Sequence, residues 1–262
     1  MEKEIGWILQ EKYPEINPAD LNGASFGKRI IAVRKDIARF KKGEPLDHII
    51  GFTDFLGCKI LAGPETLIPR PETELMAEQG IEGMKVKSGK LKVLDMFAGS
   101  GCIGISIMRH VENAHVVFAE SEKEAIEQIQ KNCKLNKTLE GRYEIIQSDI
   151  FSNVKGSFDY ILANPPYIPL TKKSTLQKSV IDYEPHAALF GGKDGMELIR
   201  RFLAAAKNRL NPSTGSGQAG KIYMEFDTPQ KPAITNLLKK LNYQKWDFHR
   251  DQYGKWRWVV VQ

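Results

Sequence analysis

Residues 91–104, LKVLDMFAGSGCIG, contain the pattern that decides the fold of this 262-residue chain. The apolar run from Leu91 to Asp95 is typical of a buried strand, and the glycines after it predict a tight turn into a helix that begins near Gly101. Downstream, strand-like and helix-like segments alternate, which predicts an α/β fold with a parallel sheet and helices on both faces. The expected strands are 91–95, 115–119, 143–147, 160–163, 221–226 and 256–261, and the expected helices are 72–79, 122–135, 195–210 and one from 101.

The segment before residue 44 has a helical character. Apolar residues at helical spacing predict helices over 1–13 and 25–42, and Gly43 lies where a glycine typically follows a helix. The second helix is rich in lysine and arginine. This charge is typical of a solvated helix face with basic residues near its C-terminus, and a docking surface is the alternative.

Short β-like pieces follow at 49–52 and 55–60, and the glycines around them predict a hairpin. Pro69-Arg70-Pro71 ends this part, and the next helix begins at Glu72. The chain is therefore expected to contain a helical domain over residues 1–44, a β-hairpin linker over 45–70 and an α/β domain over 71–262.

Composition limits the class of protein. With 42% apolar residues the chain can bury one sizeable core, and 38 basic against 32 acidic residues give a net charge of +6, which favours an acidic partner without requiring one. No apolar run is long enough to span a bilayer and the first residues are too polar for a secretory signal, so we expect a cytoplasmic protein without membrane contact. The spacing of cysteines and histidines predicts no disulfide and no metal site.

The glycine turn could serve either of two nucleotide ligands. Gly99, Gly101 and Gly104 satisfy the G-x-G-x-x-G fingerprint of dinucleotide sites. Asp95 separates the two readings, because its carboxylate would repel a pyrophosphate but attract the α-ammonium group of S-adenosylmethionine. We therefore expect an S-adenosylmethionine site formed by Asp95, Phe97, Ala98, Gly99, Ser100 and Gly101.

Acidic residues also end the next two strands. Glu120 is placed to accept hydrogen bonds from both ribose hydroxyls of either nucleotide, so it does not discriminate between them. Asp149 could accept from an adenine amino group while Ile150 packs against the ring. The alternative for Asp149 is the N-cap of a helix after it.

The tetrapeptide Asn164-Pro165-Pro166-Tyr167 follows the apolar strand 160–163. An amide oxygen followed by two residues without N–H groups leaves acceptors in fixed positions and no competing donor. Asn164 precedes a proline and is held to extended backbone, while Tyr167 offers a flat wall. Such a site suits a planar –NH2 group. The alternative is a turn without a catalytic role, since Asn-Pro often begins one.

These motifs, in this order and spacing, resemble class I S-adenosylmethionine-dependent methyltransferases that modify amino groups. Residues 67–74, LIPRPETE, closely resemble the segment before the cofactor turn in the protein-glutamine N5 enzymes that modify peptide chain release factors. Residues 45–51, PLDHIIG, and the stretch 183–195 resemble that family too. The similarity is specific from about Pro45 to Gln230, and before it only the helical character matches.

The resemblance implies a Rossmann-like, mostly parallel seven-stranded sheet and a small N-terminal helical domain that recognises the substrate. It implies methyl transfer to the N5 atom of the glutamine in the Gly-Gly-Gln loop of class I release factors. Three residues depart from the family pattern: Phe97 stands where many members have a glycine, Glu120 replaces a commoner aspartate, and Asp227 stands near where a glycine usually follows the Glu225 segment.

Site roles follow from the same resemblance. Asn164 and the Pro165 carbonyl would accept the two amide hydrogens, and Pro166 and Tyr167 would complete the catalytic and substrate site. Arg70 and Glu72 would line or brace its entrance, although a surface salt bridge is the alternative for Arg70.

A monomer that needs no direct nucleic-acid contact is expected. Two other functions stay open: an amino-group methyltransferase for a nucleic-acid base or a ribosomal-protein glutamine, and a cofactor-binding module without turnover.

Overall fold

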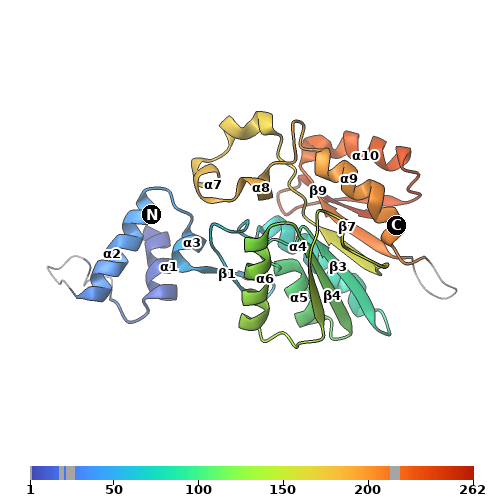
Figure 1. Cartoon of the computed structure of the whole chain (residues 1–262). Helices are drawn as coiled ribbons and strands as arrows, with labels where there is room; N and C mark the ends of the chain where they lie inside the picture. Colours follow the sequence, from blue (N-terminus) through green and yellow to red (C-terminus); the bar gives the residue numbers. More distant parts are fainter. Residues whose placement is uncertain (1, 18–20, 22–26, 213–218) are drawn as a thin grey trace.

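A seven-stranded sheet lies at the centre of the computed structural model, which describes residues 2–17, 21, 27–212 and 219–262 (Figure 1). Its strands are ordered β5-β4-β3-β6-β7-β9-β8; all neighbours are parallel except the pairs that involve β9. The predicted α/β fold with a mostly parallel seven-stranded sheet is therefore confirmed. The strands are β3 (Leu91–Met96), β4 (Ala114–Glu120), β5 (Tyr143–Gln147), β6 (Tyr160–Ala163), β7 (Lys221–Glu225), β8 (Trp246–Arg250) and β9 (Trp256–Val261).

Helices cover both faces of this sheet, and the alternation of side chains along each strand explains why. Val93 in β3 packs with one set of helices, whereas its neighbour Leu94 packs with the other. Both faces are thus apolar and both must be covered. The first set comprises α4 (Pro71–Lys85), α5 (Cys102–His110) and α6 (Lys123–Leu135), and the second comprises α9 (Glu197–Ala206) and α10 (Lys231–Lys240).

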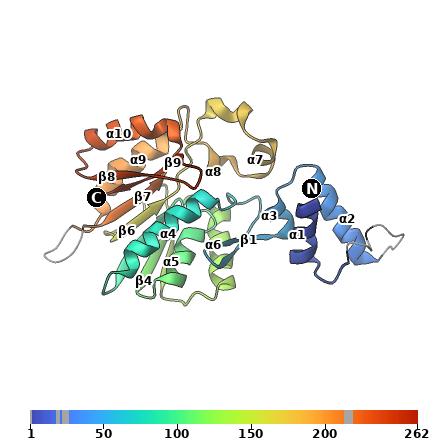
Figure 2. The ribbon, with the colours of Figure 1, turned by 180° about the vertical axis from the view of Figure 1, so that it is seen from behind.

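Three N-terminal helices pack on one another to one side of the sheet, as Figure 2 shows from behind. They are α1 (Glu2–Lys12), α2 (Lys28–Lys41) and α3 (Leu46–Ile50). Their contact centres on buried Asp36, which accepts hydrogen bonds from Lys12 Nζ at 2.6 Å, Tyr13 Oη at 2.8 Å and Arg39 Nη1 at 2.8 Å. One carboxylate therefore ties α1 to α2.

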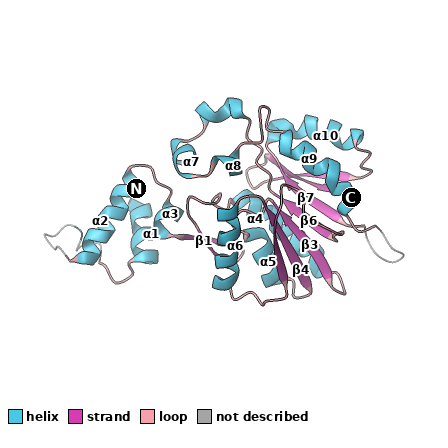
Figure 3. Ribbon diagram, in the orientation of Figure 1, coloured by secondary structure: helices cyan, strands magenta, loops and turns pink. Residues whose placement is uncertain are grey.

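A two-stranded hairpin, β1 (Phe52–Phe55) and β2 (Cys58–Leu61), connects the helices to the sheet (Figure 3). The expected strand at 49–52 is wrong in its first part, because Leu46–Ile50 forms the helix α3. Pro45 precedes this helix and Gly51 follows it with a left-handed φ of 95°. That arrangement of proline at the start and glycine at the end favours a helix over the apolar residues between them.

Between β6 and α9 the chain forms short helices over the carboxyl edge of the sheet: η2 (Leu170–Thr175), α7 (Lys178–Tyr183) and α8 (His186–Leu189). The helix expected over 72–79 continues to Lys85, and the one expected over 195–210 spans 197–206 before a 3-10 turn. Within the described ranges, no helix combines the length and apolar character that crossing a membrane requires.

Candidate active site

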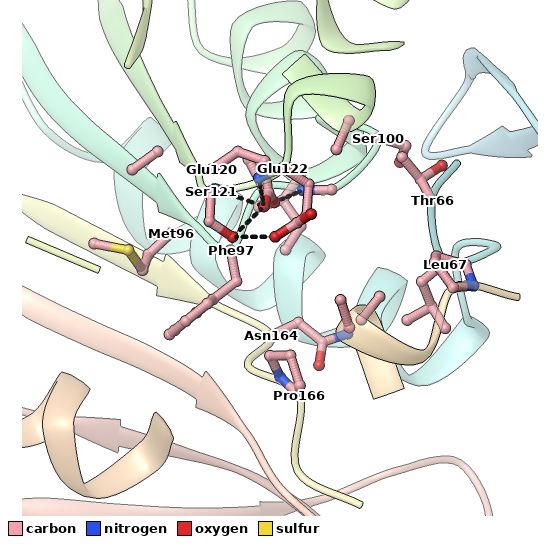
Figure 4. A pocket seen from close by; sticks show the side chains of 18 of the residues that line it. Thr66, Leu67, Met96, Phe97, Ser100, Glu120, Ser121, Glu122, Asn164 and Pro166 are labelled. Carbon is pink, nitrogen blue, oxygen red and sulfur yellow. Dashed lines mark hydrogen bonds between the residues drawn. The ribbon is translucent and has the colours of Figure 1, made fainter. Parts of the chain in front are cut away.

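A cleft opens at the carboxyl ends of β3, β4 and β6, where the strand order changes direction (Figure 4). In parallel sheets such a switch point is the usual place for a nucleotide ligand. Glu120 lies on one side of the cleft, Asn164 and Pro166 lie on another, and Thr66 and Leu67 approach from the segment before α4. The predicted site residues that line it are Arg70, Phe97, Ala98, Gly99, Ser100, Glu120, Asp149, Ile150, Asn164 and Pro166. Glu72, Asp95, Gly101, Pro165 and Tyr167 are outside this lining.

The glycine turn after β3 depends on unusual backbone conformations. Phe97, Gly99 and Gly101 have left-handed φ angles of 59°, 53° and 77°. At Gly99 an added Cβ would have one neighbour, the Phe97 carbonyl oxygen at 4.0 Å, and otherwise open space. At Gly104, by contrast, an added Cβ would lie 2.3 Å from the ring of Phe118 in β4. The first glycines therefore shape the turn, and the last lets α5 approach the sheet closely.

Glu120 fastens this turn to the end of β4. Its Oε2 accepts a hydrogen bond from the Gly99 amide at 2.8 Å, and its Oε1 accepts one from the Ser121 amide at 2.7 Å (Figure 4). An ionised carboxylate accepts at about four lone-pair positions. Glu120 therefore holds the loop in place and also presents an anionic acceptor to the cleft.

Asp95 lies beneath the turn, not on the cleft wall. It is fully buried, and its Oδ2 accepts a hydrogen bond from the Gly104 amide at 2.8 Å. Its Oδ1 is buried and has no hydrogen-bond partner among the described residues. Burial raises the pKa of this carboxyl well above its usual value. A cation or water molecule at the turn would give the orphan oxygen a partner and favour the ionised form.

Asp149 and Ile150 follow β5 and contribute another part of the lining. Asp149 Oδ2 accepts a hydrogen bond from Arg201 at 2.6 Å, and this pair is largely exposed. Residues 151–159 form turns and bends instead of a helix, which removes the helix N-cap alternative for Asp149. Ile150 has a left-handed φ of 53°, an uncommon conformation for a β-branched residue. Its side chain is buried and lines the cleft.

Asn164 follows β6 directly, and its side chain reaches toward α4. Asn164 Nδ2 donates to Thr73 Oγ1 at 3.1 Å, and Thr73 Oγ1 donates to Glu225 Oε2 at 2.6 Å. Tyr167 Oη donates to Glu225 Oε1 at 2.8 Å. Burial raises the pKa of Glu225, against the hydrogen bonds of Thr73 and Tyr167.

Neither Thr73 nor Glu225 is among the site residues predicted from the sequence. A signal for Glu225 exists, because this acidic residue ends the apolar strand 221–225 at the same sheet edge as Asp95 and Glu120. Thr73 carries no such signal, since only the fold brings the start of α4 next to that edge.

The loop after Asn164 is held by close backbone packing. An added Cβ at Gly191 or Gly195 would lie 2.2 Å from the carbonyl oxygen of Pro166 or Tyr167, respectively. Gln230 Nε2 donates to the Tyr167 carbonyl at 2.9 Å. The glycines in 191–195 therefore allow this segment to lie directly on the Asn-Pro-Pro-Tyr loop.

Arg70 connects two walls of the cleft. Its guanidinium forms an ion pair with Glu184, whose side chain is only 1% exposed, and Glu184 also accepts from the Ile68 amide at 3.3 Å. The pair lies 114 residues apart in the chain. Because the carboxylate is buried, this contact is more than the surface salt bridge considered as an alternative. It fixes the segment before α4 against the start of α8.

Comparisons with known proteins agree with this geometry. The sequence model of the methyltransferase small domain family matches residues 79–187. A methyltransferase from Pyrococcus furiosus has the same fold, with a TM-score of 0.57 at 20% identity over 90% of this chain and 98% of that chain.

Two curated relatives are similar over most of their length. The release factor glutamine methyltransferase of Flavobacterium psychrophilum is 34% identical over 99% of this chain and 92% of that protein. The enzyme of the same name from Lactococcus lactis is 34% identical over 86% of this chain and 79% of that protein. With this extent of similarity, and with a methyltransferase fold whose cleft joins the glycine turn to Asn164, the chain belongs to the release factor glutamine methyltransferase family.

Proposed function

We propose that this chain transfers a methyl group from S-adenosylmethionine to the side-chain amide nitrogen of the glutamine in the Gly-Gly-Gln loop of class I peptide chain release factors. One observation carries the proposal: the glycine turn and Asn164 line the same cleft. The turn that would bind the methyl donor and the group that would bind the substrate amide therefore face the same space. Membership of the family supports the choice of acceptor.

The residues of the cleft fit S-adenosylmethionine. The open space at Gly99 leaves room for close approach to the backbone, and Glu120 offers a carboxylate for ribose hydroxyls. An ammonium group close to the unpartnered Oδ1 of Asp95 would counter the effect of burial on the pKa of this carboxyl and favour its ionised form, whereas a pyrophosphate would not. In this proposal Asp149 and Ile150 hold the adenine end. When bound, S-adenosylmethionine supplies a methyl group on a positively charged sulfur.

The task of the remaining residues is to orient a poor nucleophile. The lone pair of a carboxamide nitrogen is delocalised into its carbonyl group, so the barrier depends on geometry and electrostatics. In this proposal Asn164 Oδ1 and the Pro165 carbonyl accept the two N–H bonds and turn the nitrogen toward the methyl group. Orientation of this kind can lower a barrier by about 7–11 kcal/mol. The acceptors also favour positive charge as it develops on nitrogen.

The packing of the loop supports the Pro165 carbonyl as the second acceptor. The Pro166 carbonyl lies against Gly191, and the Tyr167 carbonyl accepts from Gln230. Both carbonyl groups therefore have close neighbours in or near segment 191–195, which leaves the Pro165 carbonyl for the substrate. The ring of Tyr167, anchored at its hydroxyl by Glu225, would pack beside the amide. The proton would leave to water after the nitrogen gains its methyl group and becomes more acidic.

Recognition of the release factor would fall to residues outside the cleft. We assign this role to the helical domain 1–44, joined by the linker 45–70 to the catalytic domain 71–262. The basic residues of α2 then form a docking surface for the protein substrate. The enzyme would act as a monomer in the cytoplasm without direct contact to nucleic acid.

The proposal is tested by incubating the protein with methyl-labelled S-adenosylmethionine and a purified class I release factor. Label should enter the release factor but not its Gln→Ala variant in the Gly-Gly-Gln loop. Asn164→Ala should lower transfer to a small residual rate that can still be measured, while cofactor affinity is retained. Equal labelling of the Gln→Ala variant, or nuclease-sensitive labelling of a cell extract in place of the release factor, would overturn the proposed acceptor.

A further inference from the structure

Four side chains behind the candidate substrate site form a continuous hydrogen-bonded network, which we call the Glu225 network: Asn164, Thr73, Glu225 and Tyr167. They come from the ends of β6 and β7, the first turn of α4 and the loop after β6. Thr73 is 3% exposed and Glu225 is 1% exposed. Buried groups of this kind depend on each other because water cannot replace a missing partner.

The direction of every hydrogen bond in this network follows from Glu225. Burial raises the pKa of Glu225, but the hydrogen bonds of Thr73 and Tyr167 and the charge of Arg257 act in favour of the ionised form. An ionised carboxylate only accepts, so both hydroxyl groups beside it must donate. Thr73 gives its single hydrogen to Glu225 at 2.6 Å, and Tyr167 gives its own at 2.8 Å. Thr73 Oγ1 therefore has only lone pairs left for Asn164. The Nδ2 atom of Asn164 must face Thr73, as it does at 3.1 Å.

The side-chain amide of Asn164 is therefore held in one orientation. The two ends of an asparagine amide have nearly the same shape but opposite hydrogen-bonding character, so a flip costs little unless a neighbour distinguishes them. With Nδ2 held by Thr73, Oδ1 is the end that remains for the substrate. A flipped Asn164 would direct N–H groups at the –NH2 group that it has to bind.

We propose that Thr73 and Glu225 are positioning residues that fix the amide orientation of Asn164, and that Glu225 also anchors Tyr167. This inference rests on the proposed function, because it assigns significance to the acceptor Oδ1. Neither residue needs to touch the substrate. Glu225 acts through the hydroxyl of Thr73, and Thr73 acts through the side chain of Asn164.

Thr73→Val provides the first test, because it keeps the shape of the side chain and removes the hydroxyl. Label transfer to the release factor should show kcat lowered about 10- to 100-fold, the loss expected when one buried hydrogen-bonding group is left unmatched. The dissociation constant of S-adenosylmethionine should change little. Thr73→Ser, which retains the hydroxyl, should restore transfer. Thr235→Val is the matched control, since it removes a threonine hydroxyl that bonds only to the backbone of α10.

Glu225→Gln tests the direction of the network without removing its bulk. The new amide can donate to Thr73 Oγ1, and Thr73 can then donate to Asn164 Oδ1, which reverses the Asn164 amide. A kcat loss similar to that of Thr73→Val, with a thermal unfolding midpoint close to wild type, is expected. This variant also covers the case in which Thr73→Val does not fold.

A double-mutant cycle separates this inference from the proposed function. In an Asn164→Ala background, Thr73→Val should cause no further loss, because the group on which it acts is absent. Additive losses would make Thr73 a general structural residue and overturn the inference, as would wild-type kcat in both Thr73→Val and Glu225→Gln. If Asn164→Ala itself retains full transfer, the proposed role of Asn164 fails, and the inference fails with it.

Discussion

Gly104 is the glycine whose replacement should have the largest effect on the turn that we propose as the cofactor site. A Cβ at this position would lie 2.3 Å and 2.7 Å from two ring atoms of Phe118, and 2.8 Å from a methyl group of Val116. All three atoms belong to buried side chains of the neighbouring strand β4. Gly104→Ala therefore requires α5 to move away from the sheet. Because the Gly104 amide donates to Asp95, the turn before α5 should move too.

The size of the effect follows from two opposing terms. Overpacking a core costs about 1–3 kcal/mol, and contacts this short belong near the upper end of that range. Replacing glycine by alanine within a helix returns about 1 kcal/mol. The net loss should be about 2 kcal/mol. For a domain of this size that lowers the unfolding midpoint by about 4–8 °C.

Differential scanning calorimetry of Gly104→Ala, with and without S-adenosylmethionine, measures both consequences. Gly6→Ala is the matched control, because Gly6 lies inside the exposed part of α1 and an added Cβ meets nothing within 4 Å. The control should unfold at or above the wild-type temperature. If Gly104→Ala also unfolds at or above that temperature, the close approach of α5 to β4 is refuted.

Substitutions at three further positions test other parts of the structure. The pKa of Asp36 is lowered because the hydrogen bonds that it accepts outweigh the effect of burial. Its contribution to folding stability is therefore present above its unfolded pKa of about 3.9 and is lost as the pH falls further. Asp36→Asn should lower the free energy of unfolding in urea by about 2 kcal/mol at pH 7 and by less at pH 3. Phe97→Gly should be about 1–2 kcal/mol more stable than Phe97→Ala in the same assay, because alanine, unlike glycine, keeps the cost of the left-handed φ at this position. The reverse order of stability would contradict the left-handed conformation of residue 97. Arg70→Gln should raise the KM for the release factor about tenfold through loss of the buried pair with Glu184, and an unchanged KM would show that this pair does not shape the entrance.

The parallel part of the sheet could be predicted because its strands are buried on both faces. Such strands read as short apolar runs, and those beginning at Leu91 and Tyr160 end at the residues that the sequence indicated, within one position. Strand β8 was missed for the opposite reason. It is an edge strand, and its sequence WDFHR has a weak apolar pattern with only partial burial. The other edge strand, β5, is buried to a similar extent but carries the adjacent apolar pair Ile145 and Ile146, which the sequence pattern reveals.

Glycines misled the prediction of helix α4, which extends past Gly80 and Gly83 to Lys85. Glycine usually weakens a helix, so an end near Gln79 was expected. In the structure a Cβ at Gly80 would lie 3.1 Å from Leu162, and one at Gly83 would lie 3.2 Å from the hydroxyl of Tyr223. Both glycines let α4 lie close to the sheet. Sequence alone does not distinguish that role from a helix end.

In the cleft too, features built from contiguous residues could be predicted, whereas contacts between residues far apart in the sequence could not. The glycine turn and the Asn-Pro-Pro-Tyr loop are contiguous motifs whose chemistry can be read from neighbouring residues. The contact between Thr73 and Glu225 joins positions 152 residues apart, and no local pattern indicates it. The placement of Asp95 beneath the turn depends likewise on how α5 packs against β3.

Acidic residues at three strand ends have a common physical role in this fold. Asp95 accepts from the Gly104 amide, Glu120 accepts from the Gly99 amide, and Glu225 accepts from Thr73 and Tyr167. At Glu225 an ionised carboxylate fixes the direction in which two hydroxyl groups donate. At Asp95 and Glu120 the partners are backbone N–H groups, which can only donate, so the carboxyl group fixes their position. The carboxyl ends of the strands thus carry the residues that determine how the cleft's loops and side chains face. The proposed mechanism depends on orientation instead of a strong base, so it would require this kind of control: an error in a single donor direction would leave the substrate amide unbound.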